Sequence, residues 1–196
     1  SLSKLRHQAR LQFQGRSSDV PLFELLPVLG ERRGFYRMPK AVDGDLFFDM
    51  EGNPLEEGGL EYLFGLYIDE AGQQTFKPFW AHTREEEKVA FEHFIDWGIG
   101  HFKRYPDAHI YHYASYEETA IKRLMSQHGT RETQVDWLLR NGKLIDLYKV
   151  VREAIRVSEP SYSIKYIEHF YMERRVGEVT SAGASIVFYE RWKQSG

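Results

Sequence analysis

The segment Asp45-Leu-Phe-Phe-Asp-Met-Glu-Gly-Asn-Pro54 constrains the fold of this chain more than any other. Its apolar side chains predict a strand that packs in a core, and Gly-Asn-Pro predicts the turn that ends it. In a strand, residues i and i+2 point to the same face, so the carboxylates of Asp49 and Glu51 project side by side. Two adjacent anions repel unless something binds them, and a hard divalent cation does so through oxygen ligands. The alternative is that both acids merely cap a strand running into a turn.

Two more strands and a long helix follow this segment. Residues 58–69 and 74–80 predict strands that complete an antiparallel meander. From Thr83 the apolar period becomes helical, with Thr83 as N-cap and an apolar stripe that ends near Tyr105. The first turn of this helix contains Glu85, Glu86 and Glu87. The helix dipole favours acids at this position, so we assign the three glutamates no catalytic role.

The next predicted strand and helix contain another candidate acid. Residues 108–113 predict a fourth strand, buried beside the first, and Ser115 is expected to cap a helix that ends near Gly129. Glu117 lies at the start of this helix. It is either a second metal-facing acid or an ordinary acid of a helix N-terminus, and for a single glutamate the second explanation is the stronger.

The remaining elements are shorter. Residues 130–140 predict a helix, residues 144–152 a fifth short strand that runs into a helix, and residues 161–171 another short helix. Asp146 stands at the junction of strand and helix, where it is a candidate metal-side acid or a helix N-cap. The order is therefore three strands, helix, strand, two helices, strand and two helices. With Asp-x-Glu on its first strand, this order predicts an α/β ribonuclease H-like fold, a mixed five-stranded sheet with helices on both faces.

Six blocks between residues 44 and 192 are similar to the YprB-type ribonuclease H-like domain of predicted RecB-family nucleases. They are Phe48 to Pro54, Gly59 to Leu66, His109 to Ala120, Leu144 to Arg152, Ser161 to Glu168 and Ala184 to Trp192. That family belongs to the DnaQ-like or DEDD group of metal-dependent 3′-5′ exonucleases, which use four acids. Several blocks in the right order are far more specific than any one of them.

The resemblance implies a set of site residues. Asp49 and Glu51 are the two metal-binding acids of its first motif. The second motif, Asn-x-x-Phe-Asp, aligns with residues 113–117, so its acid is Glu117, one methylene longer than the usual aspartate. The family's last motif, Tyr-x-x-x-Asp, has no counterpart before residue 196, so we expect a truncated C-terminal part.

The resemblance also implies cofactors, a reaction and partners. Two Mg²⁺ or Mn²⁺ ions about 4 Å apart are expected, one activating water and the other stabilising the leaving 3′ oxygen of a phosphodiester. The expected substrate is DNA or RNA with a single-stranded 3′ end, from which hydrolysis begins. A helicase or a second nuclease domain in the same polypeptide is an expected partner. The alternative is a catalytically inactive module that binds nucleic acid or docks within such an assembly.

Four side chains are candidates for nucleic-acid contact. Tyr113 and Tyr116 offer aromatic rings on which a terminal base could stack, and Lys122 and Lys165 offer positive charge. The tyrosines are more often packing residues in a strand beside a core, and the lysines are equally well explained as solvated helix residues.

Composition excludes several other classes. The chain has no cysteine, so thiol catalysis and cysteine-ligated zinc or iron–sulfur sites are excluded. Its net charge of −3 argues against a broad phosphate-binding surface, although a local basic face is sufficient for an exonuclease. No apolar run approaches the roughly 20 residues that a membrane span requires. With no signal peptide, a cytoplasmic location is the expectation.

The N-terminal residues differ in character from the rest. Residues 1–16 predict a basic amphipathic helix and residues 17–39, rich in proline and glycine, predict a linker. We therefore expect residues 1–40 to be either an arm or the end of an upstream domain, and residues 41–196 to be the ribonuclease H-like domain. With 42% hydrophobic and 15% aromatic residues, the chain can bury one substantial core.

Overall fold

The computed structural model describes residues 2–27, 30–70, 72–173 and 182–195. The chain forms two compact units, a smaller one of Ser1–Leu25 with Ile155–Gly196 and a larger one of Leu26–Ala154. The expected domain boundary near residue 40 lies inside the larger of these compact units. Residues on both sides of it belong to the larger unit, and the N-terminal residues join the C-terminal ones instead.

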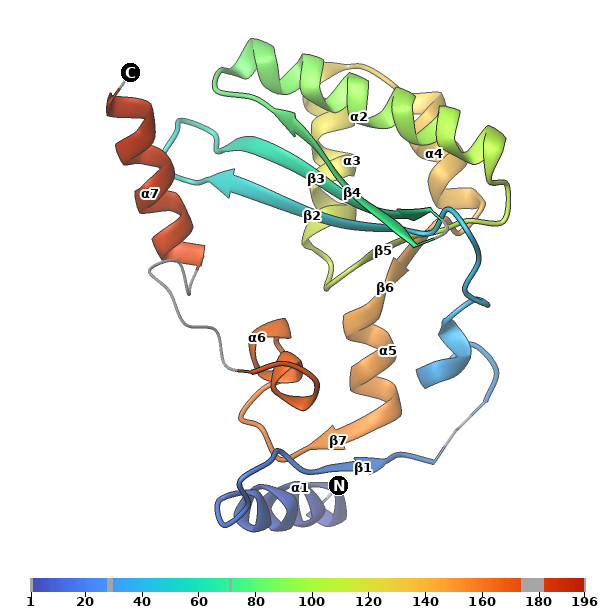
Figure 1. Ribbon diagram of the computed structural model, residues 1–196, viewed down its shortest axis with the longest axis vertical. Coiled ribbons are helices and arrows are strands. Elements are labelled where there is room, and N and C mark those ends of the chain that lie inside the picture. Colours follow the sequence, from blue (N-terminus) through green and yellow to red (C-terminus); the bar gives the residue numbers. More distant parts are fainter. Residues whose placement is uncertain (1, 28–29, 71, 174–181, 196) are drawn as a thin grey trace. The chain divides into compact units, whose positions relative to one another are not determined.

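The larger unit is a five-stranded mixed sheet flanked by helices (Figure 1). Its elements are η1 (Gly34–Arg37), β2 (Leu46–Asn53), β3 (Leu60–Glu70), β4 (Gln73–Trp80), α2 (Arg84–Arg104), β5 (Ile110–His112), α3 (Tyr116–His128), α4 (Glu132–Arg140), β6 (Leu144–Asp146) and α5 (Leu147–Ala154). The strand order is β4-β3-β2-β5-β6. β2 pairs antiparallel with β3 and parallel with β5, so the predicted α/β class and central first strand are confirmed.

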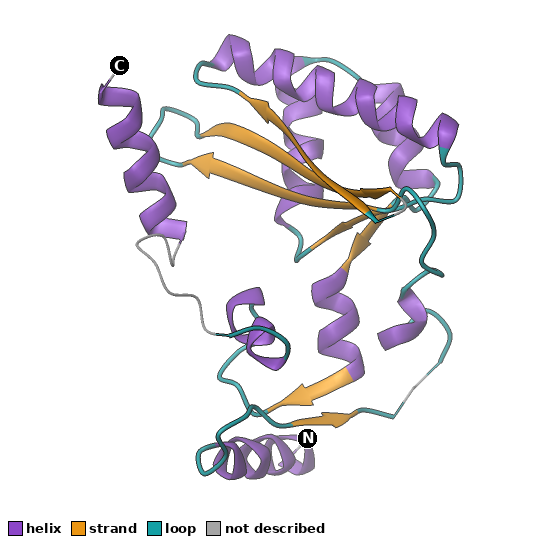
Figure 2. Ribbon diagram, viewed as in Figure 1, coloured by secondary structure: helices purple, strands orange, loops and turns teal. Residues whose placement is uncertain are grey.

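The smaller unit contains α1 (Leu2–Gly15), β1 (Phe23–Leu25), β7 (Ile155–Val157), α6 (Ile164–Ile167), η2 (Glu168–Phe170) and α7 (Ala182–Ser195), as Figure 2 shows by type of element. The predicted N-terminal helix is confirmed. The expected linker is not a plain connection, because β1 pairs with β7 and η1 forms a 3-10 turn. The helix predicted over residues 161–171 is a single α-helical turn followed by a 3-10 turn.

The core lies between the sheet and α2, α3 and α4, which gather on one side of it (Figure 1). In β2 the side chains alternate, so that Leu46, Phe48 and Met50 are buried in this core. Phe48 stacks on Phe94 of α2 with ring centroids 4.5 Å apart. Burying one such side chain contributes about 1.5–3 kcal/mol, so this face fixes which side of β2 points outward.

Of the helix ends predicted at Thr83, Ser115 and Gly129, two are confirmed. Thr83 accepts a hydrogen bond from Glu86 N at 3.2 Å and begins α2, and Gly129 ends α3 with a left-handed φ of +56°. Ser115, predicted to cap α3, makes no side-chain capping bond and has helical dihedral angles, so this prediction is wrong.

Candidate active site

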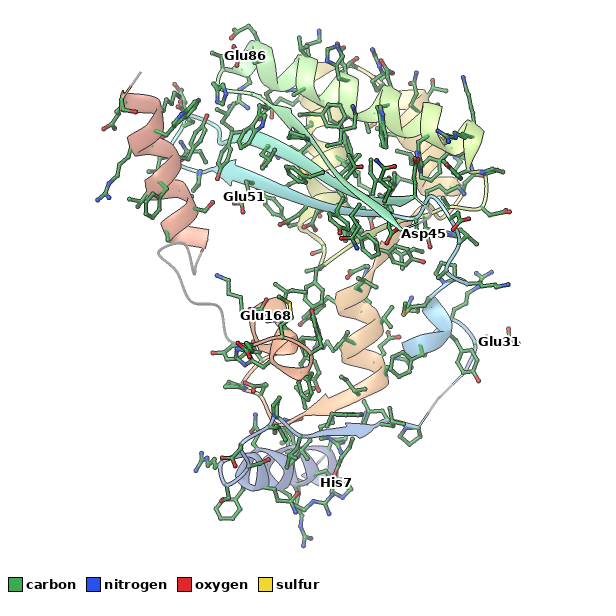
Figure 3. All side chains as sticks on the ribbon, in the orientation of Figure 1. His7, Glu31, Asp45, Glu51, Glu86 and Glu168 are labelled. Atoms are coloured by element: carbon green, nitrogen blue, oxygen red, sulfur yellow. The ribbon has the colours of Figure 1, made fainter. Side chains whose placement is uncertain are left out.

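The two acids of the first motif lie on one face of the central strand. Phe48 and Met50 face the core, so Asp49 and Glu51 point to the opposite face, where Asp49 is exposed and Glu51 is half-buried. Figure 3 shows Glu51 near the carboxyl end of β2. Tyr62 donates its hydroxyl to Glu51 Oε2 at 3.5 Å. The expected same-face arrangement of the carboxylates is thus confirmed.

A β-bulge follows the acid pair directly. The register pairs Glu51 with Leu63 and then Gly52 with Glu61, which leaves Tyr62 as the extra residue. A Cβ at position 52 would overlap the carboxylate of Glu61 and lie 2.8 Å from Tyr116 Oη. Glycine is therefore favoured at this position by the side chains that lie against it, and not by its φ angle.

Glu61, which pairs with Gly52 at this bulge, is a buried acid that the sequence did not single out. We call this end of β2 and β3, around Gly52 and Glu61, the corner of the sheet. Glu61 is 3% exposed and accepts the Tyr116 hydroxyl at 2.8 and 2.9 Å and the guanidinium of Arg123. Burial raises the pKa of Glu61, and the bonds from Tyr116 and Arg123 oppose that rise. The pKa of Tyr116 is raised by burial and by the Glu61 charge. The sequence signal is limited to an acid that stands next to the apolar run of β3.

Glu117 lies in the first turn of α3, directly after β5. It is 4% exposed, and its Oε2 is 3.5 Å from His112 Nδ1. This buried oxygen has no hydrogen-bond partner within the described residues. Because β5 is parallel to β2, the carboxyl ends of both strands lie at the same edge of the sheet. The fold therefore brings Glu117 to the edge at which Glu51 lies.

The chemistry of these acids fits a hard divalent cation, but a closed ligand set is not formed. Asp49 and Glu51 offer carboxylate oxygens on one face, and the unsatisfied oxygen of Glu117 is the kind of atom that a cation would bind. Over the described ranges, no group of three or more His, Asp or Glu side chains is close enough to hold a metal ion. The sharing of one ion by all three acids stays a prediction.

Asp146 acts as a helix cap. Its Oδ1 accepts from the backbone N–H groups of Ala114 at 3.1 Å and Lys149 at 3.3 Å, and its Oδ2 is 3.4 Å from Lys149 Nζ. The N-cap alternative for this residue is thus confirmed. Both oxygens are already used by the protein itself.

The four candidates for nucleic-acid contact differ in their surroundings. Tyr113 packs edge-on against Tyr148 with centroids 5.8 Å apart, while the Tyr116 side chain is 50% exposed although its hydroxyl binds Glu61. Lys122 is ion-paired with Glu118 one turn earlier. Lys165 is exposed on α6 of the smaller unit. The structure therefore leaves the Tyr116 ring as the most accessible aromatic surface of the set.

Comparison with known proteins decides the family. A family model described as RNase_H superfamily matches residues 46–196, which include β2 and every later element of the chain. The chain belongs to the ribonuclease H superfamily. Proteins of this superfamily are typically nucleases, and they generally act on nucleic acids with divalent metal ions. Neither curated proteins nor solved structures gave a match.

The ribonuclease H assignment agrees with the sheet order and with the position of the acid pair on the central strand. None of the helices in the described ranges combines the length and apolarity of a membrane span.

Proposed function

We propose that this ribonuclease H superfamily domain is a metal-dependent nuclease of the 3′-5′ exonuclease type, related to YprB-type domains, that hydrolyses phosphodiester bonds of DNA or RNA. One observation carries the proposal: Asp49 and Glu51 project together from the central strand on the face away from the core. Two carboxylates held side by side by a rigid sheet are an arrangement suited to a divalent cation.

The residues of the chain have distinct parts in this proposal. Asp49 and Glu51 would hold Mg²⁺ or Mn²⁺, with Glu117 as a further ligand. Bound in a pair, such ions supply an activated water and charge stabilisation for an in-line displacement. Tyr62 orients the Glu51 carboxylate through its hydroxyl, and Gly52 leaves room for Glu61 beside the pair. The Glu51 carboxylate therefore has a protein partner that orients it without an ion.

The proposed substrate is a single-stranded 3′ end, presented by a larger nuclease or helicase–nuclease polypeptide. The half-exposed ring of Tyr116 offers a stacking surface for a terminal base next to this corner of the sheet. Stacking of this kind is independent of base identity, so we propose a nuclease without sequence preference.

The test is degradation of single-stranded DNA and RNA, labelled separately at the 3′ and 5′ ends, with Mg²⁺ or Mn²⁺. We expect early loss of a 3′ label, and no cleavage in Asp49→Asn, in Glu51→Gln or with a chelator. Asp136→Asn is the matched control, because Asp136 is exposed and pairs with Arg140, one turn further along α4. Metal-independent cleavage, or unchanged cleavage by Asp49→Asn, would exclude the proposal.

A second function is favoured by one observation, the lack of a ready three-ligand group in the described ranges. It is a catalytically inactive module that binds nucleic acid or docks in a helicase–nuclease assembly. Its signature is metal-independent binding of a fluorescent single strand, without cleavage, by wild type and Asp49→Asn alike.

A further inference from the structure

The connection from β5 to α3 contains a strained residue. Ala114 has a φ of +78°, in the left-handed region that residues other than glycine rarely adopt. Such a conformation persists only where surrounding groups impose it, and it commonly marks a functional site. The turn lies directly before the helix that carries Glu117, so what imposes the strain bears on where that carboxylate points.

Two buried side chains hold the strained residue from opposite ends. Asp146 Oδ1 accepts a hydrogen bond from Ala114 N at 3.1 Å, and His112 Nδ1 is 2.7 Å from Ala114 O. A carbonyl oxygen can only accept, so the proton is assigned to His112 Nδ1. The His112 side chain is 0% and that of Asp146 7% exposed. Both polar atoms of the Ala114 backbone are thus tied to the ends of β5 and β6.

The start of α3 is fixed in the same way. His112 Nδ1 is also 3.5 Å from Glu117 Oε2, and the neighbouring Tyr116 hydroxyl is bound by the buried Glu61. The turn therefore enters α3 with its backbone, its tyrosine and its acid each in contact with a buried group. Among the buried side-chain oxygens of the described ranges, only Glu117 Oε2 makes no hydrogen bond.

We propose that Asp146 and His112 are positioning residues: they hold the strained Ala114 turn so that the Glu117 carboxylate is presented at the carboxyl edge of β5. The proposal rests on the proposed nuclease function, and it assigns Asp146 a role different from that of a metal ligand. This role does not require the negative charge of Asp146. It requires only that Oδ1 accepts hydrogen bonds from two backbone N–H groups.

Asparagine and alanine at position 146 separate the two roles. An asparagine Oδ1 accepts the same two hydrogen bonds and is an equally good N-cap, so Asp146→Asn keeps the turn but lacks the charge of a ligand. Asp146→Ala loses both bonds. Loss of a side chain that holds a metal-binding group in place typically costs about 10- to 100-fold in activity or metal affinity. For Asp146→Ala we expect kcat and Mn²⁺ affinity to fall by that factor, while KM for the single-stranded nucleic acid stays unchanged. In Asp146→Asn, kcat and Mn²⁺ affinity should both recover.

A second variant distinguishes positioning from stability. Glycine adopts a positive φ without a steric penalty, so Ala114→Gly introduced into Asp146→Ala should recover thermal stability. It should not recover the rate, because the turn is still not held. Full recovery of kcat by the double variant would mean that Asp146→Ala acted only through stability, and this would overturn the proposal.

Hydrogen exchange of the Ala114 amide gives a readout that needs no cleavage. We expect protection in wild type and Asp146→Asn, and faster exchange by at least about tenfold in Asp146→Ala, since a released amide opens locally. Equal loss of rate and of Mn²⁺ binding in Asp146→Asn and Asp146→Ala would make Asp146 a ligand and refute the proposal, as would a wild-type rate in Asp146→Ala. If wild type cleaves nothing, the nuclease proposal fails, while the exchange rates still decide whether Asp146 holds the turn.

Discussion

Glu87 is the residue whose loss we expect to destabilise the larger unit most. It is 0% exposed, in the first turn of α2. Its Oε1 accepts from Glu61 N at 2.7 Å, and its Oε2 accepts from Arg84 Nη1 at 2.6 Å and lies 2.9 Å from His128 Nε2. One buried carboxylate thus joins the start of β3, the start of α2 and the end of α3.

The expected magnitude follows from what Glu87→Ala leaves behind. Arg84, whose side chain is 33% exposed, loses its counter-charge, and the N–H of Glu61 and the ring of His128 each lose a buried acceptor. Breaking a buried ion pair on one side costs about 3–5 kcal/mol, and each orphaned buried donor costs about 1–3 kcal/mol, in overlapping accounts of the same loss. We therefore expect a destabilisation of about 4 kcal/mol, or about 10–15 °C in Tm.

The assay is urea unfolding at pH 7, followed by tryptophan fluorescence and extrapolated to zero denaturant. Glu85→Gln is the matched control, because Glu85 is an exposed glutamate in the same helical turn, and its change should stay within about 0.5 kcal/mol. High salt should leave the difference between Glu87→Ala and wild type nearly unchanged, since buried pairs are weakly screened. A loss below about 1 kcal/mol for Glu87→Ala would refute the reasoning.

Three further outcomes are expected. Hydrogen bonds from Arg37 and from Gly34 N lower the pKa of Glu153 to about 2 from 4.5, so its stabilisation is complete above pH 4.5 and is lost as the pH falls towards 2. As the pH falls through that window, Glu153→Gln should lose about 1 kcal/mol less unfolding free energy than wild type, a figure that allows for screening because the Glu153 side chain is 23% exposed. The same acid transition in both proteins would contradict this. Gly52→Ala should lower the unfolding free energy by about 1–3 kcal/mol, whereas Gly100→Ala should raise it by about 0.5–1 kcal/mol, because an added Cβ there would meet nothing within 4 Å beyond the backbone of its own helix. Equal effects of the two variants in thermal melts would show that the side chains around position 52 move aside. Thr83→Ala should cost about 1 kcal/mol in the same melts through the lost cap of α2, and no loss would show that Glu86 N is satisfied by water.

Much of the fold was predictable because its signals are local. The alternation in β2, the change of period at Thr83 and the glycine stop at position 129 all act between residues a few positions apart. The same is true of the acid pair, since one face of a strand follows from its period of two. The capping role of Asp146 was one of two alternatives that its position at a strand–helix junction left open.

The partners of individual acids were not predictable in this way. Three consecutive glutamates at a helix start look alike in the sequence, yet Glu87 alone is fully buried, because the side chain of His128 and the N–H of Glu61 meet it there. Glu61 itself appeared as one charged residue in a strand. Its role depends on Tyr116 and Arg123, which lie 55 and 62 positions further along the chain.

The sequence by itself therefore determined the order of strands and helices in the larger unit and the pairing of Asp49 with Glu51 on one face. Only the tertiary structure decided that β1 joins β7, that Gly52 must admit Glu61, and that Ala114 is held at a positive φ by two side chains. The physical reason is the range of the forces involved. Periodicity and capping act within one or two turns of the backbone. Whether a charge is stable when buried depends instead on which hydrogen-bond donors, far away in the sequence, are packed against it.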